Sequence, residues 1–178
     1  MRSSLIIFAI FLMIYNASLA QEQRVSPLSV TTSRYKDTYV KIVYSQPHKN
    51  GRDIFGKLVP FGEVWRTGAN EATEITITRS IMVNGQELKA GTYSIFTIPN
   101  KTTWTIIFNT DLGLWGSYNY NPKKDALRID VPVLPTKEVA EALTIGIDAR
   151  NNEADFFFHW DKTKVIIPVK YKEPDLKP

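Results

Sequence analysis

The feature that most constrains the fold is the alternation of apolar and polar residues in six separate stretches of the chain. Successive side chains of a β-strand point to opposite faces of its sheet, so each stretch predicts a strand with one buried and one solvated face. β-Branched and aromatic residues dominate the apolar positions, as suits a half-buried pleated surface. The stretches are Val40–Tyr44, Ile75–Thr78, Trp104–Phe108, Leu127–Val133, Leu143–Asp148 and Lys164–Lys170.

Two further stretches have apolar residues on both faces, namely Tyr93–Ile98 and Phe156–Phe158. They predict central strands, or strands whose outer face is covered by another part of the chain. Asn84-Gly85 predicts a type I′ hairpin turn, because both of its turn residues must adopt positive φ. Only 136–142 is compatible with a helix, and that helix would be short. The sequence therefore predicts an all-β, antiparallel, jelly-roll-like sandwich of about nine to eleven short strands.

The first twenty residues have the pattern of a secretory signal peptide. Arg2 is their only charge, and the apolar run Leu5–Tyr15 is shorter than the roughly 20 residues that span a bilayer. Ser18 and Ala20 are the small residues that a signal peptidase recognises. We expect cleavage after Ala20 and a periplasmic or extracellular protein. The expected organisation is a signal peptide at 1–20, one β-domain at 21–171 and a flexible tail at 172–178.

The composition of the 178-residue chain excludes several classes of protein. It contains no cysteine, so disulfides, thiolate metal sites and a cysteine-linked lipid anchor are excluded. The net charge of +4 is small and its cations are scattered, which argues against nucleic acid as a partner. We expect no membrane span after signal cleavage, no metal and no cofactor. The oligomeric state is not indicated.

Residues 44–73 depart from the alternating pattern, because they mix turn formers, aromatic residues and charges. A connection of this length inside one domain is uncommon and is usually functional or disordered. Its aromatic and aliphatic content argues against disorder. Four glycines in it predict repeated backbone bends or close approaches. We therefore expect the functional surface in this segment.

Several motifs in and around this segment resemble one known family. The most specific is the run Val64-Trp-Arg-Thr-Gly-Ala-Asn-Glu-Ala-Thr73. Other matching motifs are Gly51–Gly56, Leu58–Pro60, Ala90–Ser94, Ile98-Pro99, Trp104-Thr105, Phe108-Asn109, Trp115-Gly116 and Leu127-Arg128. On these motifs the chain resembles the domain of unknown function 2911 family. The resemblance covers nearly all of the chain beyond residue 20. It implies an exported bacterial protein with a β fold, and it supplies no activity and no catalytic residues.

Within the Val64–Thr73 run, Trp65, Arg66, Asn70 and Glu71 bring together an aromatic ring, a cation, an amide and a carboxylate. One interpretation is architectural: Arg66 and Glu71 form a buried bidentate pair, and Asn70 adopts the left-handed region. The other is a pocket in which Arg66 holds an anionic or polyol ligand against Trp65 or Trp115. Under either interpretation we expect Arg66, Asn70 and Glu71 to converge at the start of the following strand, where Gly68 permits a sharp bend.

A second candidate surface is the loop containing Trp115 and Tyr118, in which aromatic and small polar residues alternate. Exposed rings there could stack on sugars or peptides, since each has an apolar face and a polar edge. Alternatively, Trp115 pins the loop to the core.

The sequence supports a catalytic site less strongly than it supports either candidate binding surface. Glu63 and Glu71 are candidates for the two carboxylates of a glycosidase, which must lie about 5–10 Å apart. His48, Lys49, Arg52 and a tyrosine are candidates for a lyase, since proton abstraction needs a base and a cation. A metal site at His48, His159 and Asp161 fits no dedicated spacing, so we expect none.

The leading hypothesis is a non-enzymatic binding module of the cell envelope, with a small polar molecule, a glycan or a peptide as its ligand. The alternatives are a carbohydrate-active hydrolase or lyase and a purely structural envelope protein. A deep cleft lined by two free carboxylates, or by His48 and Arg66, would favour the enzyme. A shallow aromatic face would favour the binder, and a buried Arg66–Glu71 pair would favour the structural role.

Overall fold

The computed structural model describes residues 24–173, whose regular structure is β-strand apart from one 3-10 turn at Pro122–Lys124. Every strand pairs antiparallel with its neighbours, which confirms the predicted fold class. The predicted signal peptide and most of the predicted tail lie outside the described residues. The strands are β1 (Leu28–Tyr35), β2 (Thr38–Ser45), β3 (Thr73–Ile77), β4 (Ile81–Val83), β5 (Gln86–Leu88), β6 (Gly91–Ile98), β7 (Thr103–Asn109), β8 (Asp125–Arg150) and β9 (Glu153–Tyr171).

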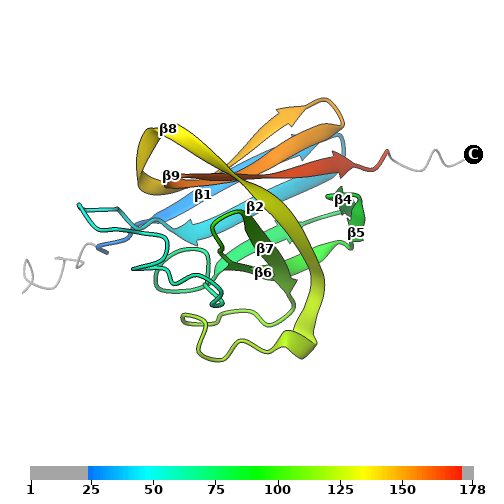
Figure 1. The fold of residues 1–178 in the computed structure, drawn as a ribbon. Helices are drawn as coiled ribbons and strands as arrows, with labels where there is room; N and C mark the ends of the chain where they lie inside the picture. The colour runs from blue at the N-terminus through cyan, green and yellow to red at the C-terminus, as the bar shows by residue number, and fades with distance from the viewer. Residues whose placement is uncertain (1–23, 174–178) are drawn as a thin grey trace, which may run out of the picture.

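The strands follow the order β1-β2-β3-β6-β7-β8-β9-β4-β5. Strands adjacent in sequence are therefore adjacent in the sheet, except that the β4–β5 hairpin joins the far side beside β9. The sheet folds over at β8 into two layers that face each other, as Figure 1 shows. One layer contains β1, β2, β3, β6, β7 and the first part of β8, and the other contains the rest of β8 with β9, β4 and β5.

The expectation of short strands is wrong for β8 and β9, which contain 26 and 19 residues. β8 pairs with β7 as far as Pro132, and from Val133 onward it pairs with β9. The register shifts between Pro135 and Ala140 and again between Ala140 and Thr144. Both irregularities lie in the part of β8 that already pairs with β9, so they bend this pair of strands within the second layer.

The short helix considered for residues 136–142 is also absent, because this stretch belongs to β8. Its Lys, Glu and Ala residues favour a helix locally. Tertiary pairing overrides that preference: the Lys49 amide donates to the Glu141 carbonyl at 2.6 Å, and the Leu143 amide donates to the Pro47 carbonyl at 2.9 Å. The chain that leaves β2 thereby crosses to the second layer and pairs with β8 there.

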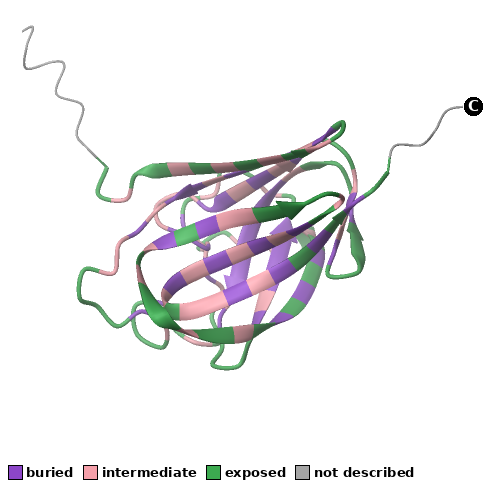
Figure 2. Ribbon diagram, turned by 90° about the horizontal axis from the view of Figure 1, so that it is seen from above, coloured by how far each residue is buried: buried purple, intermediate pink, exposed green. Residues whose placement is uncertain are grey.

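The alternating stretches point their apolar residues into one core between the layers, and Figure 2 shows the resulting alternation of buried and less buried positions. In β2, Val40, Ile42 and Tyr44 are buried, and in β9, Phe156 and Phe158 are buried. The predicted strand positions are thus confirmed. Hydrophobic burial of about 25 cal/mol per Å² makes this core the main stabilising feature of the domain.

The two doubly apolar stretches have different outer faces. Phe96 of β6 packs with Ala72 and Ile107 in a second, smaller cluster, which Val64, Leu114 and Tyr120 cover. The expectation that β6 is covered on its outer face is therefore confirmed. In β9, Phe157 is only half-buried: its ring lies over Gly146, and the Lys164 ammonium lies 4.5 Å from the ring centroid.

The predicted Asn84-Gly85 turn joins β4 to β5, with φ angles of 46° and 78°. Both angles are positive, as a type I′ turn requires, so this prediction is confirmed. Among residues 24–173, no helix is long and apolar enough to cross a bilayer.

Candidate functional site

The long connection between β2 and β3 is ordered by packing and by hydrogen bonds to both layers. Ile54 and Val59 are buried, and the Val59 amide donates to the Ile54 carbonyl at 2.9 Å to close a tight turn. Further along, Trp65 and Thr97 of β6 exchange two backbone hydrogen bonds, at 2.8 and 2.9 Å. This connection therefore behaves as a built part of the domain, and it carries most of the lining of one cavity.

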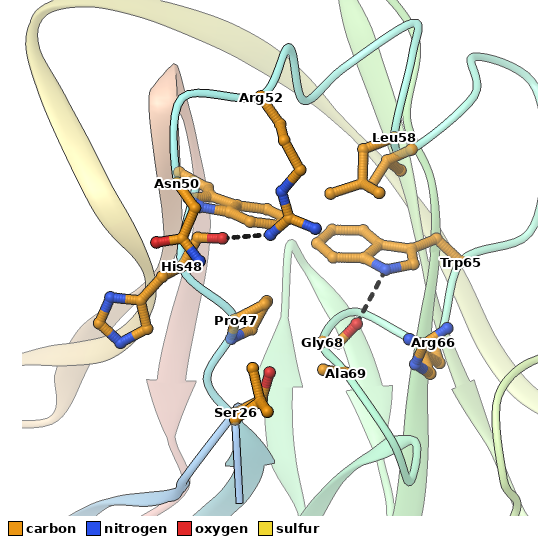
Figure 3. Close-up of a pocket in the computed structure, with 13 residues that line it drawn as sticks. Ser26, Pro47, His48, Asn50, Arg52, Leu58, Trp65, Arg66, Gly68 and Ala69 are labelled. Atoms are coloured by element: carbon orange, nitrogen blue, oxygen red, sulfur yellow. Dashed lines mark hydrogen bonds between the residues drawn. The ribbon is translucent and has the colours of Figure 1, made fainter.

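The cavity has a volume of about 200 Å³ and lies between this connection and Trp160 in the middle of β9 (Figure 3). Four of the predicted site residues line it: His48, Arg52, Trp65 and Arg66. None of its lining residues is acidic. The other lining residues are Val25, Ser26, Pro47, Asn50, Leu58, Val59, Gly68, Ala69 and Trp160.

One wall of the cavity is aromatic. The rings of Trp65 and Trp160 are stacked, with centroids 5.9 Å apart and an interplanar angle of 18°. Trp104 and Phe55 pack edge-on against Trp65 at 6.1 Å each. The Trp65 indole N–H donates to the Gly68 carbonyl at 3.1 Å. This hydrogen bond holds the indole in place.

Arg52 supplies one cation. Its Nε donates to the Lys49 carbonyl at 2.9 Å, and its Nη2 donates to the His48 carbonyl at 2.5 Å. Figure 3 shows the guanidinium directed into the space between the His48 carbonyl and the Trp65 indole. Carbonyl groups satisfy its hydrogen-bonding capacity in part but carry no net charge, so the positive charge remains uncompensated by a carboxylate in residues 24–173.

Arg66 supplies the second cation, and it is half-buried. Its Nε is fully buried and has no hydrogen-bond partner among the described residues, where the guanidinium also forms no salt bridge. Burial lowers the pKa of Arg66 from its ordinary value, and the nearby Tyr118 hydroxyl acts in the opposite direction. An arginine still remains charged at neutral pH. Desolvating a charge without a partner is unfavourable, so Arg66 needs an explanation beyond packing.

Thr67, the next residue, has φ of 57° and is completely buried. Positive φ in a β-branched residue is an outlier that costs about 1–3 kcal/mol. The Thr67 carbonyl accepts from the Thr73 hydroxyl at 2.7 Å, and its own hydroxyl lies 3.2 Å from that of Thr97. These contacts hold the backbone in the strained conformation that sets the direction of Arg66.

The predicted convergence of Arg66, Asn70 and Glu71 is confirmed for Asn70 and Glu71 and is wrong for Arg66. The Glu71 carboxylate pairs with Arg24 at 3.1 Å, and both Glu71 and Asn70 reach the Ser45 hydroxyl, at 3.3 and 3.5 Å. The pKa of Glu71 is lowered, mainly because the carboxylate accepts a hydrogen bond from the Glu71 backbone N–H and to a smaller extent because it pairs with Arg24. Arg66 takes no part in this group. The buried Arg66–Glu71 pair of the architectural interpretation therefore does not form.

The local backbone was partly anticipated. Asn70 has the expected positive φ, 56°, and Thr73 begins β3 as expected. Gly68 does not provide the bend, since the positive φ angles belong to Thr67 and Asn70. Its role is close approach: a Cβ there would lie 3.0 Å from the Ser45 carbonyl oxygen.

His48 lines the cavity with Arg66, but mainly through its backbone. The backbone of His48 forms an isolated β-bridge with Ala142 in β8. The His48 carbonyl accepts a hydrogen bond from the Arg52 guanidinium. Figure 3 shows the imidazole pointing away from Trp65 and Arg66. The arrangement therefore places no imidazole base beside either guanidinium.

Trp115 and Tyr118 are outside the cavity lining and are strongly exposed, at 60% and 85%. The loop is pinned by Leu114 and Tyr120, which pack on the small Phe96 cluster, so the expectation that Trp115 pins it is wrong. Its backbone is also held: the Ala72 amide donates to the Leu114 carbonyl at 2.8 Å.

The structure does not bring together the residues of the predicted carboxylate pair or of the metal site considered above. Glu63 is exposed, and neither it nor Glu71 lines the cavity. Within residues 24–173, no three His, Asp or Glu side chains are grouped to hold a metal ion. Asp161 pairs with Lys49 at 2.9 Å, and His159 lies 3.2 Å from the Thr136 hydroxyl.

Sequence reasoning missed Trp160, Asn50 and Ser26. Trp160 follows Phe156 and Phe158 at alternate positions of β9, and such positions face the core. The sequence pattern therefore predicts only a core residue there. Asn50 lies in the unusual 44–73 segment but belongs to none of the residue combinations considered there, and Ser26 precedes the first strand without a distinctive pattern. No sequence signal marks these three as neighbours of Arg66.

The fold and the cavity define an all-β domain with a cationic, tryptophan-walled pocket. The chain belongs to the family described as "Protein of unknown function (DUF2911)", whose model matches residues 26–169. No curated protein and no solved structure shows a significant match to the chain.

Proposed function

We propose that this protein is an exported binding module of the cell envelope, which holds a small anionic molecule in the cavity without transforming it. The observation that carries the proposal is the charge of the lining: two arginines and no acidic residue. Neither guanidinium has a carboxylate partner among residues 24–173. A site of this kind favours an anion by simple electrostatics.

The energetics of Arg66 support this proposal. The Arg66 guanidinium has no carboxylate partner among the described residues, and a ligand carboxylate or phosphate in the cavity would supply the opposite charge. Charge-assisted hydrogen bonds of this type are about twice as strong as neutral ones. The strain at Thr67 is of the kind found at ligand clamps, where surrounding contacts hold an unfavourable conformation.

The same geometry argues for binding over catalysis. A hydrolase would need a pair of carboxylates near the bound ligand, and the cavity lining contains none. A lyase at His48 would need its imidazole beside the substrate, and the ring points away. The proposed envelope location depends on the signal-peptide pattern of residues 1–20. Detection of Gln21 as the N-terminus of the native protein would support export, and an intact Met1 would contradict it.

The binding proposal can be tested by tryptophan fluorescence, since Trp65 and Trp160 line the cavity. We would titrate the protein with galacturonate, phosphate, citrate and neutral galactose, and measure Tm in parallel. An anion should change the fluorescence and raise the stability, by about 2.7 kcal/mol at 100 times its Kd. Galactose should do neither.

Arg66→Gln and Arg52→Gln should abolish the response to the anion. Arg34→Gln is the matched control, because Arg34 is an exposed arginine on β1 outside the cavity. It should respond as the unmodified protein does. If no anion in the panel alters fluorescence or Tm, or if Arg34→Gln is as damaging as Arg66→Gln, the proposed function is wrong.

A further inference from the structure

Two large exposed aromatic side chains lie on a loop next to the cavity, and the proposed function does not use them. Trp115 and Tyr118 belong to the connection between β7 and the turn at Pro122–Lys124. Figure 1 shows this connection beside the one that precedes β3. Exposed aromatic rings on one loop offer flat apolar faces that a ligand can contact.

Backbone hydrogen bonds place this loop at the rim on the Arg66 side. The Gly116 amide donates to the Asn70 carbonyl at 3.0 Å, and Asn70 directly follows the cavity-lining Ala69. Glu71 and Trp115 also form a bridge.

The loop is anchored at its base while its rings stay exposed. Leu114 and Tyr120 pack against the Phe96 cluster on either side of Trp115 and Tyr118. The Tyr120 hydroxyl donates to Asp125 at 2.7 Å, which fixes the far end of the loop. A surface held in this way loses little conformational entropy when it binds a ligand.

The size of the cavity limits what it can enclose. Its volume of about 200 Å³ is somewhat larger than a cavity of roughly 150 Å³ that accommodates benzene. It therefore holds about one six-membered ring. A longer ligand would extend beyond the cavity.

We propose that the ligand is an acidic oligosaccharide, with one charged sugar in the cavity and the following sugars stacked on Tyr118 and Trp115. This inference depends on the proposed function, since it takes the cavity as an anion site. The two arginines select the acidic group, and the exposed rings offer flat apolar faces to the C–H faces of sugars. Ser117 and Asn119, which flank Tyr118, are small polar residues suited to hydrogen bonds with sugar hydroxyls.

The test compares ligands of increasing length by calorimetric titration of the protein. The probes are galacturonate, trigalacturonate, the methyl ester of trigalacturonate and a triglutamate peptide. Trigalacturonate should bind about tenfold more tightly than galacturonate, a change that corresponds to about 1.4 kcal/mol. The uncharged ester should bind at least about tenfold more weakly than trigalacturonate, because it lacks the charges that the arginines recognise.

Trp115→Ala and Tyr118→Ala should reduce the affinity for trigalacturonate to that for galacturonate. Leu112→Ala is the matched control, since Leu112 is an exposed apolar residue of the same loop that has no aromatic ring. It should keep the full gain with length. Circular dichroism of each variant establishes that the fold is retained.

The outcomes separate this inference from the proposed function. If galacturonate binds but trigalacturonate gains nothing, or if the aromatic variants keep the gain, the oligosaccharide inference is overturned and the anion site stands. An equal gain for triglutamate would overturn the sugar class in favour of an acidic peptide. If no anion binds at all, both proposals are wrong.

Discussion

Arg128 is exposed and Arg66 is half-buried, and the two arginines also differ in their partners. Arg128 donates to the Asp125 carboxylate at 3.0 Å and to the Tyr120 hydroxyl at 3.2 Å. The Asp125 carboxylate also accepts hydrogen bonds from the Tyr120 hydroxyl at 2.7 Å and from the side-chain amide of Asn109 at 2.8 Å. Arg66 has no such partner in the described part of the chain. A saturated polar network indicates a structural role, whereas an unsaturated cation beside a cavity indicates a role in binding.

The strongest test of this comparison is Asp125→Ala. The Asp125 side chain is 7% exposed, and its removal leaves Asn109, Tyr120 and Arg128 without their shared acceptor. We expect a loss of about 2–4 kcal/mol in the free energy of unfolding, measured by urea denaturation. Asp37→Ala, which breaks the exposed pair of Asp37 with Arg79, should cost less than about 1 kcal/mol. Equal losses in the two variants would remove the distinction between a saturated network and a surface pair.

Gly68→Ala tests the packing that supports the cavity. The added Cβ would lie 3.0 Å from the Ser45 carbonyl oxygen, which belongs to the backbone of β2 and cannot rotate away. We expect the segment around Arg66 to shift, with a loss of about 1–3 kcal/mol in stability and weaker anion binding. Thermal denaturation and the galacturonate titration measure the two effects. An unchanged Tm would show that this contact is not restrictive.

The Tyr120 hydroxyl predicts how the saturated network responds to pH. Burial, followed by the hydrogen bond to Asp125, raises its pKa from 10.0 to about 12. The folded protein therefore retains a proton that the unfolded chain releases, so this contribution to stability is complete below pH 10 and is lost between pH 10 and 12. Urea midpoints of the unmodified protein should fall more steeply over this range than those of Tyr120→Phe. Parallel slopes would contradict the assignment.

Arg66→Gln should have the smallest effect on stability. No partner among the described residues is lost with the charge, and a half-buried unpaired cation is removed, so the free energy of unfolding should change by less than about 0.5 kcal/mol. The variant should nevertheless lose its response to anions. A destabilisation as large as that of Asp125→Ala would place Arg66 in the structural class with Arg128.

The fold could be predicted further than the site. Alternation in β2, β3, β7 and β9 reflects a local rule, since each strand buries every second residue against the core. The Asn84-Gly85 turn likewise depends on two residues alone. In contrast, 136–142 has helix-forming residues, and its pairing with β9 and with the segment around Lys49, both distant in sequence, makes it a strand.

Four of the eight predicted site residues line the cavity because they share one segment, which composition identified as unusual. The pairing of their charges could not be predicted. Glu71 is closer in sequence to Arg66 than to Arg24, yet the backbone turn at Thr67 and Asn70 sends the two side chains to different places. Trp160 arrives from β9, nearly a hundred positions away, and long-range neighbours of this kind leave no trace in a single sequence.

The continuity of β8 has a consequence for how the domain unfolds. One unbroken strand contributes Asp125–Pro132 to the first layer and Val133–Arg150 to the second. Neither half of the domain can therefore melt while the other keeps its full complement of strands. The β8–β9 pairing is closed by a short turn at Asn151 and Asn152, so its contacts nearest that turn are also local in the chain and can form early during folding. We expect a single cooperative transition, with identical midpoints for the fluorescence of the cavity tryptophans and for the far-ultraviolet signal of the strands.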